Sequence, residues 1–216
     1  MRMEEILETT DYEEEQEKIM FRGTGADRGG AGDGTADAPV DAAGGTVDGQ
    51  SSCLGENRVF YLPYLMGERS PHNDPDARAA FIGMSMDTTR ADMTLAVLEG
   101  VAFGLRDSLE VARSIGISPR RTKICGGGAK SPLWRKIIAN VMNMKVDLIE
   151  SEEGPGYGAA ILAAVGCGVF DSVEKAAKTL VKVTGTEEPD PELVEKYEER
   201  YQKFRRLYPA LKGIVI

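Results

Sequence analysis

Residues 121–150, RTKICGGGAKSPLWRKIIANVMNMKVDLIE, decide the fold of this chain. They begin with a short strand, Arg121–Cys125, which runs into three consecutive glycines. Ser131 and Pro132 are residue types preferred at the cap and first position of a helix, and a second strand follows at Lys145–Glu150. Because strand and helix alternate, the stretch predicts a parallel or mixed sheet with covering helices.

Two strands and one long helix precede this unit. The strands are expected at Arg58–Leu65 and Ala80–Met86, separated by a charged, proline-rich loop. The helix is expected to begin after Thr89, which forms a capping-box pattern with Asp92, and to end at Gly116.

Two glycines, Gly100 and Gly104, lie inside this long helix. Each costs about 1 kcal/mol relative to alanine in a helix interior. We therefore expect both at places where close backbone packing leaves no room for a side chain.

Three more helices are expected downstream. A glycine-rich turn at Glu153–Gly158 opens a helix of small residues that continues to Val165, and Ser172 begins the next helix. Asp190 caps the last one, whose inward face carries Leu193, Tyr197, Phe204, Leu207 and Leu211. The order from residue 58 is β-β-α-β-α-β-α-α-α, which is typical of an α/β domain.

The first 55 residues differ from the rest in composition. Residues 1–21 are acidic and are expected to be helical. Residues 22–55 contain ten Gly, six Ala and five Asp, and few large apolar side chains. Such a stretch cannot bury enough surface to offset the entropy of ordering it, so we expect a disordered insert or linker that proteases cut first. Residues 56–216 then form the folded domain.

Length and charge limit the classes of function. The chain has 216 residues, enough for one domain, with 35 acidic against 26 basic side chains. A net charge of −9 argues against binding to nucleic acid or to a membrane surface. Cys53, Cys125 and Cys167 form neither a zinc spacing nor a disulfide framework, and the start has no apolar signal sequence. A cytoplasmic protein with reduced thiols is expected.

The glycines at 126–128 form the first candidate site. Without side chains the backbone can approach a ligand, and the helix that follows offers free N–H groups at the positive end of its dipole. A nucleotide could bind there, but a tight strand-to-helix turn also needs glycine, so both interpretations stand. A phosphate loop of the GxxxxGK[ST] type is absent from the sequence.

A second pattern lies around the long helix. The motif A-x-F-x-G-M at 79–84, followed after seven residues by D-M-x-x-A-V-L-E at 92–99, resembles the second signature of the FGGY family of carbohydrate kinases. The flanking stretches YLPYLMGERSPHNDPDARAAFIGM and ICGGGAKSPLWRKIIANVM resemble the xylulokinases of that family. The resemblance covers residues 57–212, and more weakly 1–20, but not 22–55.

The resemblance implies a partial actin-like ATPase domain, which is ribonuclease-H-like with a mixed sheet and covering helices. Family members use ATP and Mg²⁺ to phosphorylate a sugar hydroxyl. Their adenosine loop matches Gly126, Gly127, Gly128, Ala129, Lys130 and Ser131 of this chain. Their catalytic Asp and sugar contacts lie in an N-terminal domain. We therefore assign no catalytic and no metal-binding residue here, and we expect the isolated chain to be inactive.

The implied function is the nucleotide-binding C-terminal portion of an ATP-dependent sugar kinase of the xylulokinase type. Its partners would be ATP or ADP, and a sugar only together with an N-terminal domain. Two alternatives stay open: a catalytically inactive truncated remnant, and an interaction module that completes a separately encoded N-terminal half. A second copy of the chain is a further partner to consider. The residues do not select one sugar within the family.

Several other residues have a structural interpretation beside a functional one. Trp134 is expected to be a packed core aromatic, and Cys125 a buried small hydrophobe. The turn at 154–158 matches a family turn near the adenine, although GPGYG departs from the more common Ala-Leu-Gly. His72, the single histidine, is assigned a structural or sugar-side loop role rather than catalysis.

The carboxylates near these residues also have a structural interpretation. Asp92 is expected to cap its helix rather than share acid–base work with Glu99, which is seven residues further on. The loop before the second strand is expected to form a salt-bridged surface from Glu68, Arg69, Asp74, Asp76 and Arg78.

Overall fold

The computed structural model describes residues 54–150 and 154–214. The predicted acidic helix at 1–21 and residues 22–53 of the predicted linker lie outside this part of the chain. Leu54 is the first of the described residues, and its side chain is buried in the main core.

Two short strands and a long helix form the first unit. β1 (Phe60–Leu62) pairs antiparallel with β2 (Ala80–Ile82), in a register that places Phe60 opposite Ile82. Both strands occur where the sequence predicted them, but they are shorter. They form a separate two-stranded sheet, whereas the alternation of elements had suggested a single sheet.

Helix α3 (Arg90–Ser114) begins with the predicted capping box. The Thr89 hydroxyl accepts the backbone N–H of Asp92 at 3.2 Å, and the Asp92 carboxylate accepts the backbone N–H of Thr89 at 2.9 Å. The helix ends just before Gly116, which has a φ of +88°. The predicted start and the predicted stop of this helix are therefore both confirmed.

The two glycines within α3 have different surroundings. A Cβ on Gly100 would lie 2.1 Å from the carbonyl oxygen of Tyr61, so the strand backbone approaches the helix directly there. A Cβ on Gly104 would meet only the ring of Pro63, at 3.5 Å, an ordinary contact. Close backbone packing therefore explains Gly100 but not Gly104.

The second sheet contains three strands in the order β3-β4-β5. β3 (Arg121–Ile124) and β4 (Lys145–Ile149) are parallel, joined by α4 (Pro132–Met142). β5 (Val183–Glu187) adds to the far side of β4 in the antiparallel direction. The predicted mixed sheet is confirmed, but β5 was not anticipated from the sequence.

The main core lies where α3, α4 and α7 (Pro191–Phe204) meet. Phe103 of α3 is surrounded by the rings of Tyr197, Tyr201 and Phe204 of α7, with centroids 5.1–6.2 Å away. From α4, Leu133 and Ile137 are fully buried. The short helix α8 (Leu207–Leu211) follows α7 at the end of the described chain.

Arginines of α3 hold the C-terminal end of α4. Arg106 donates a hydrogen bond to the carbonyl oxygen of Val141 at 3.0 Å, and Arg113 donates one to that of Met142 at 3.1 Å. The last carbonyls of a helix have no partner within it, so these bonds satisfy groups that would otherwise need water. Arg106 also forms an ion pair with Glu198 of α7.

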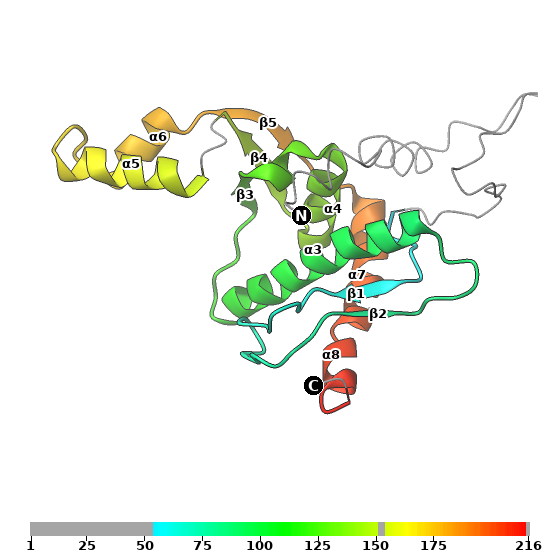
Figure 1. The fold of residues 1–216 in the computed structure, drawn as a ribbon. Helices are drawn as coiled ribbons and strands as arrows, with labels where there is room; N and C mark the ends of the chain where they lie inside the picture. Colours follow the sequence, from blue (N-terminus) through cyan, green and yellow to red (C-terminus); the bar gives the residue numbers. More distant parts are fainter. Residues whose placement is uncertain (1–53, 151–153, 215–216) are drawn as a thin grey trace, which may run out of the picture.

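Helices α5 (Gly154–Gly166) and α6 (Val173–Leu180) pack on each other and project beyond the sheet, at the opposite end of the molecule from α8 (Figure 1). The glycines predicted to form a turn at 153–158 belong, from Gly154 onward, to α5 itself. Ile161 is the one buried residue of α5, while Leu162 is 58% exposed. Among the described residues, no helix is both long and apolar enough to cross a membrane.

Candidate functional site: the glycine loop after β3

The two parallel strands bring two segments to one edge of the sheet. Residues 125–131 follow the end of β3, and α5 begins at Gly154, shortly after β4 ends. A Cβ on Gly154 would lie 2.7 Å from the sulfur of Cys125, so the start of α5 touches the start of the glycine loop. Ligands of open α/β sheets bind outside the carboxyl ends of the strands, which is where these two segments meet.

The loop opens with a left-handed residue and continues as a single 3₁₀ turn. Gly126 has a φ of +86°, a conformation that favours glycine. The turn Gly127–Lys130 follows, and the N–H of Ala129 donates to the carbonyl oxygen of Gly126 at 3.0 Å. A Cβ on Gly126 or Gly127 would meet nothing within 4 Å, so this stretch of backbone is open to a ligand.

The third glycine has a different role. A Cβ on Gly128 would lie 1.8 Å from a ring carbon of Trp134, so the indole packs directly on the backbone there. Trp134 is partly buried against the main core, which confirms its interpretation as a packing aromatic. Its indole N–H is buried, and it has no hydrogen-bond partner among the residues that the structure describes. Gly128 therefore supports the shape of the loop, while Gly126 and Gly127 provide the open backbone.

The second half of the loop is tied to α4. The Ser131 hydroxyl accepts the N–H of Trp134 at 3.1 Å, which confirms the predicted helix cap. Arg135 donates hydrogen bonds to the carbonyl oxygens of Ala129 and Lys130, at 2.7 and 3.1 Å. Arg135 was not predicted from the sequence, although its place in the first turn of α4 puts it next to the preceding loop. These bonds occupy loop carbonyls and leave the open glycines for contacts from outside.

Cys125 is exposed, which corrects the expectation that it is a buried small hydrophobe. The residue lies beyond the last paired position of β3, next to Gly154 at the start of α5. Cys125 and Cys167 are both free and exposed thiols.

The loop that contains His72 is held by hydrogen bonds and ring stacking. The imidazole stacks on Tyr208, with centroids 3.9 Å apart, and meets Tyr64 edge to face. Glu68 accepts the backbone N–H groups of Ser70 and His72, both at 2.7 Å. His72 is thereby built into the loop, as its assigned role requires.

The expected salt-bridged surface in this loop is largely wrong. Asp74 accepts the hydroxyl of Tyr208, and this hydrogen bond lowers the pKa of its carboxyl. Arg78 donates to the carbonyl oxygens of Pro75 and Ala77, at 3.1 and 2.8 Å. Among the residues that the structure describes, only Lys212 approaches Asp74 as an ion-pair partner, at 3.8 Å. The tight turns of the loop leave several backbone N–H and carbonyl groups without backbone partners. Charged side chains form hydrogen bonds with these groups instead of ion pairs with one another.

Asp92 and Glu99 do not act together. Asp92 caps α3, as predicted, whereas Glu99 is fully buried and pairs with Arg200 of α7 at 2.7 Å. Burial raises the pKa of Glu99, and the positive charge of Arg200 opposes that rise. The second carboxylate is therefore a structural group between two helices.

Comparison with known proteins identifies the family. The model for the C-terminal domain of the FGGY family of carbohydrate kinases matches residues 29–167. The chain belongs to this family. The matched range includes residues 29–55, which the sequence analysis had assigned to the linker.

Several xylulose kinases are among the relatives of this chain. The xylulose kinase of Staphylococcus epidermidis is 40% identical over 164 residues, which are 76% of this chain and 33% of that protein. The Bacillus subtilis xylulose kinase is 36% identical over 74% of this chain and 32% of its own length. The chain thus spans about a third of the length of these curated relatives.

Solved structures agree with the fold. The xylulose kinase from Rhodospirillum rubrum superposes with a TM-score of 0.65 at 32% identity, covering 76% of this chain and 33% of that one. A gluconate kinase from Lactobacillus acidophilus has a TM-score of 0.69 at 24% identity, covering 81% and 36%, which shows the fold alone. The predicted FGGY resemblance and the partial actin-like fold are both confirmed.

Proposed function

We propose that this chain is the nucleotide-binding C-terminal part of an ATP-dependent sugar kinase of the xylulokinase type. The observation that carries the proposal is the open backbone at Gly126 and Gly127, at the carboxyl ends of two parallel strands. The xylulose kinase relatives support the substrate class. A cytoplasmic location, proposed by analogy with the same relatives, is part of the proposal.

The glycine loop would hold the adenosine of ATP or ADP. A nucleotide at this edge can approach the backbone of Gly126 and Gly127 without displacing a side chain. Ala129 and Lys130 are fixed by Arg135, and Ser131 caps α4, so the loop needs little reorganisation on binding. A preformed loop lowers the cost of binding because fewer groups must be ordered.

The chemistry of transfer would need groups beyond this loop. In phosphoryl transfer, Mg²⁺ neutralises charge on the phosphates and a carboxylate orients the attacking hydroxyl. Within 54–150 and 154–214, no group of three or more His, Cys, Asp or Glu side chains is placed to hold a metal ion. We therefore propose that the metal ligands and the sugar-binding carboxylate belong to the further length that the relatives have, and that the 216-residue chain alone gives no sugar-dependent ADP release.

Titration with ATP tests the nucleotide site. The Gly127→Val side chain would enter the open approach path without striking the protein, so the fold should be unchanged. Losing about one backbone contact, worth roughly 1–1.5 kcal/mol, should weaken ATP binding about tenfold. Gly166→Val is the matched control, because a Cβ there also meets nothing within 4 Å but lies at the far end of α5. Equal affinities for all three proteins would refute the proposal.

The alternative of an interaction module is favoured by one observation. β3 lies at the end of the strand order, so among the described strands its outer edge is unpaired. Unpaired edges accept strands from other chains. Mixing this chain with the N-terminal two thirds of the Staphylococcus epidermidis xylulose kinase tests this: ADP release that requires both pieces, ATP and D-xylulose would support completion of a kinase. Absence of complex formation between the pieces would remove this alternative.

A further inference from the structure

The C-terminal helices carry a basic surface in an otherwise acidic protein. Residues 203–214, KFRRLYPALKGI, contain four basic side chains and no acidic one. Lys203, Arg205 and Arg206 are exposed, and we call them the α7–α8 basic surface. They line two adjoining hollows of about 720 and 700 Å³. The first is also lined by Glu198, Glu199 and Gln202, and the second is floored by Leu207, Pro209 and Ala210.

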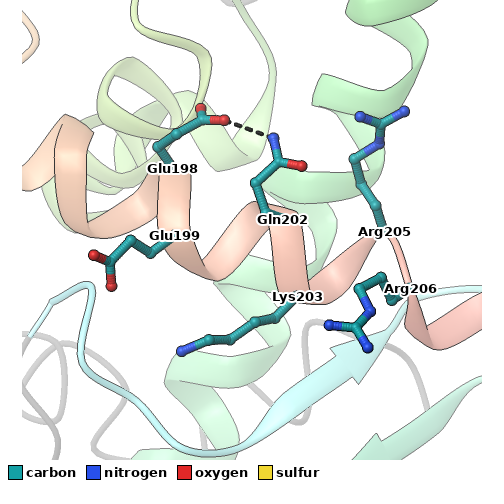
Figure 2. Close-up of a pocket in the computed structure, with 6 residues that line it drawn as sticks. All are labelled: Glu198, Glu199, Gln202, Lys203, Arg205 and Arg206. Carbon is teal, nitrogen blue, oxygen red and sulfur yellow. Dashed lines mark hydrogen bonds between the residues drawn. The ribbon is translucent and has the colours of Figure 1, made fainter.

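Two of these cations point the same way. Figure 2 shows Lys203 and Arg206 on one side of α7, while Arg205 extends on the other side. Arg205 lies near the ring of Tyr201, at 5.7 Å from its centroid. Within the described part of the chain, neither Lys203 nor Arg206 forms an ion pair, whereas Glu198 is already engaged by Arg106 and Gln202.

The described part of the chain begins beside this helix, at Leu54 and Gly55, which we call the exit point. A Cβ on Gly55 would lie 2.8 Å from the Cβ of Lys196, and Glu56 forms an ion pair with the Lys196 ammonium. Lys196 and Lys203 lie on one face of α7, because positions seven residues apart in a helix lie nearly in line, and Arg206 follows two residues after the end of α7. Seven residues of helix span about 10 Å, so Lys203 lies close to the exit point.

The sequence outside the structure has the complementary charge. Residues 1–21 contain eight acidic side chains and only two basic ones. They also include Ile6, Leu7, Ile19 and Met20. The 32 residues at 22–53 connect them to the exit point, and a glycine-rich chain of that length has an end-to-end distance of about 30 Å. The acidic segment can therefore reach the basic surface of its own chain.

We propose that residues 1–21 of this chain bind the α7–α8 basic surface in cis. The acidic side chains pair with Lys203 and Arg206, and the apolar ones contact Leu207, Pro209 and Ala210. Individual exposed ion pairs are weak and are screened by salt. Tethering offsets this weakness because the linker sets an effective concentration in the millimolar range.

Paramagnetic broadening in the full chain tests the proposal. A nitroxide is attached to Tyr12→Cys after Cys53, Cys125 and Cys167 have been replaced by alanine. At low salt, amide signals of residues 203–212 should be lost, while those of α6 remain. Raising the salt from about 0.1 M to about 1 M shortens the Debye length from about 10 Å to about 3 Å and should restore the signals.

Charge reversals identify the contact. K203E/R206E should abolish the broadening, whereas the matched control K175E/K178E, on two exposed lysines of α6, should keep it. Adding E13K/E14K/E15K to K203E/R206E should bring the broadening back. Broadening that survives K203E/R206E, or that never occurs on α7 and α8, refutes the proposal. So does broadening of an isotope-labelled chain by a separate spin-labelled one, since the occupant would then be a second copy.

Discussion

The contact between α3 and α7 and the contact between α5 and α6 show two ways of joining helices in this molecule. The first buries aromatic rings and an ion pair, Glu99 with Arg200, at 2.7 Å. The second contact is formed by helices whose own ion pairs are exposed to solvent, such as Lys178 with Glu174 within α6. Ion pairs in the two places therefore carry very different energies, because only Glu99 and Arg200 have lost their water.

The largest difference in the free energy of unfolding is expected when one carboxylate is removed from the α3–α7 contact and one from α6. Glu99→Ala leaves the guanidinium of Arg200 buried without its partner, which should cost about 3–5 kcal/mol of the free energy of unfolding. Glu174→Ala removes an exposed partner and should cost less than about 1 kcal/mol. Urea denaturation of the two variants measures both values. Similar losses would mean that the α3–α7 pair is as well hydrated as the surface pair.

Replacing a glycine with alanine should destabilise the protein in one region and stabilise it in the other. Gly100→Ala forces a methyl group against the Tyr61 carbonyl oxygen, and overpacking of this kind costs about 1–3 kcal/mol. Gly158→Ala meets nothing within 4 Å in exposed α5 and should stabilise that helix by about 0.5–1 kcal/mol. Thermal unfolding, with hydrogen exchange of α5 amides for the local effect, checks both. A neutral Gly100→Ala would contradict the close contact of α3 with β1.

A smaller contribution to stability is expected from the hydrogen bond between Asp74 and Tyr208. Its pKa is lowered in the folded chain by the Tyr208 hydroxyl, so the pair stabilises the protein at neutral pH, and this contribution is lost as pH falls through the lowered pKa. Tyr208→Phe should raise the pKa of Asp74 towards its ordinary value. Carboxyl NMR titration measures the change, and Tyr157→Phe, which removes a hydroxyl bound to Leu180 in the α5–α6 pair, should leave it unaltered.

The difference between the two regions also explains what the sequence could predict. Caps such as Thr89 with Asp92 depend on residues a few positions apart, so their pattern is visible in the sequence. The position of α5 depends on contacts across the fold, and the glycines at 154–158 gave no sign that they continue a helix. β5 was missed because VTGTE contains a glycine and gains its strand character from pairing with β4.

The candidate site was predictable to a similar extent. The family resemblance indicated residues 126–131. It could not distinguish the open glycines from Gly128, on whose backbone the Trp134 ring packs. Arg135 escaped notice because an arginine on a helix surface has many partners within reach. Its turn back to the carbonyl oxygens of Ala129 and Lys130 is visible only in the structure.

Helix α4 is fastened at both ends, by Arg135 to the glycine loop and by Arg106 and Arg113 to α3. A helix held at both ends keeps its regular structure when one end is displaced. We expect a ligand that moves the glycine loop inward to tilt α4 as a rigid body, so that α3, at the other end of α4, is displaced as well.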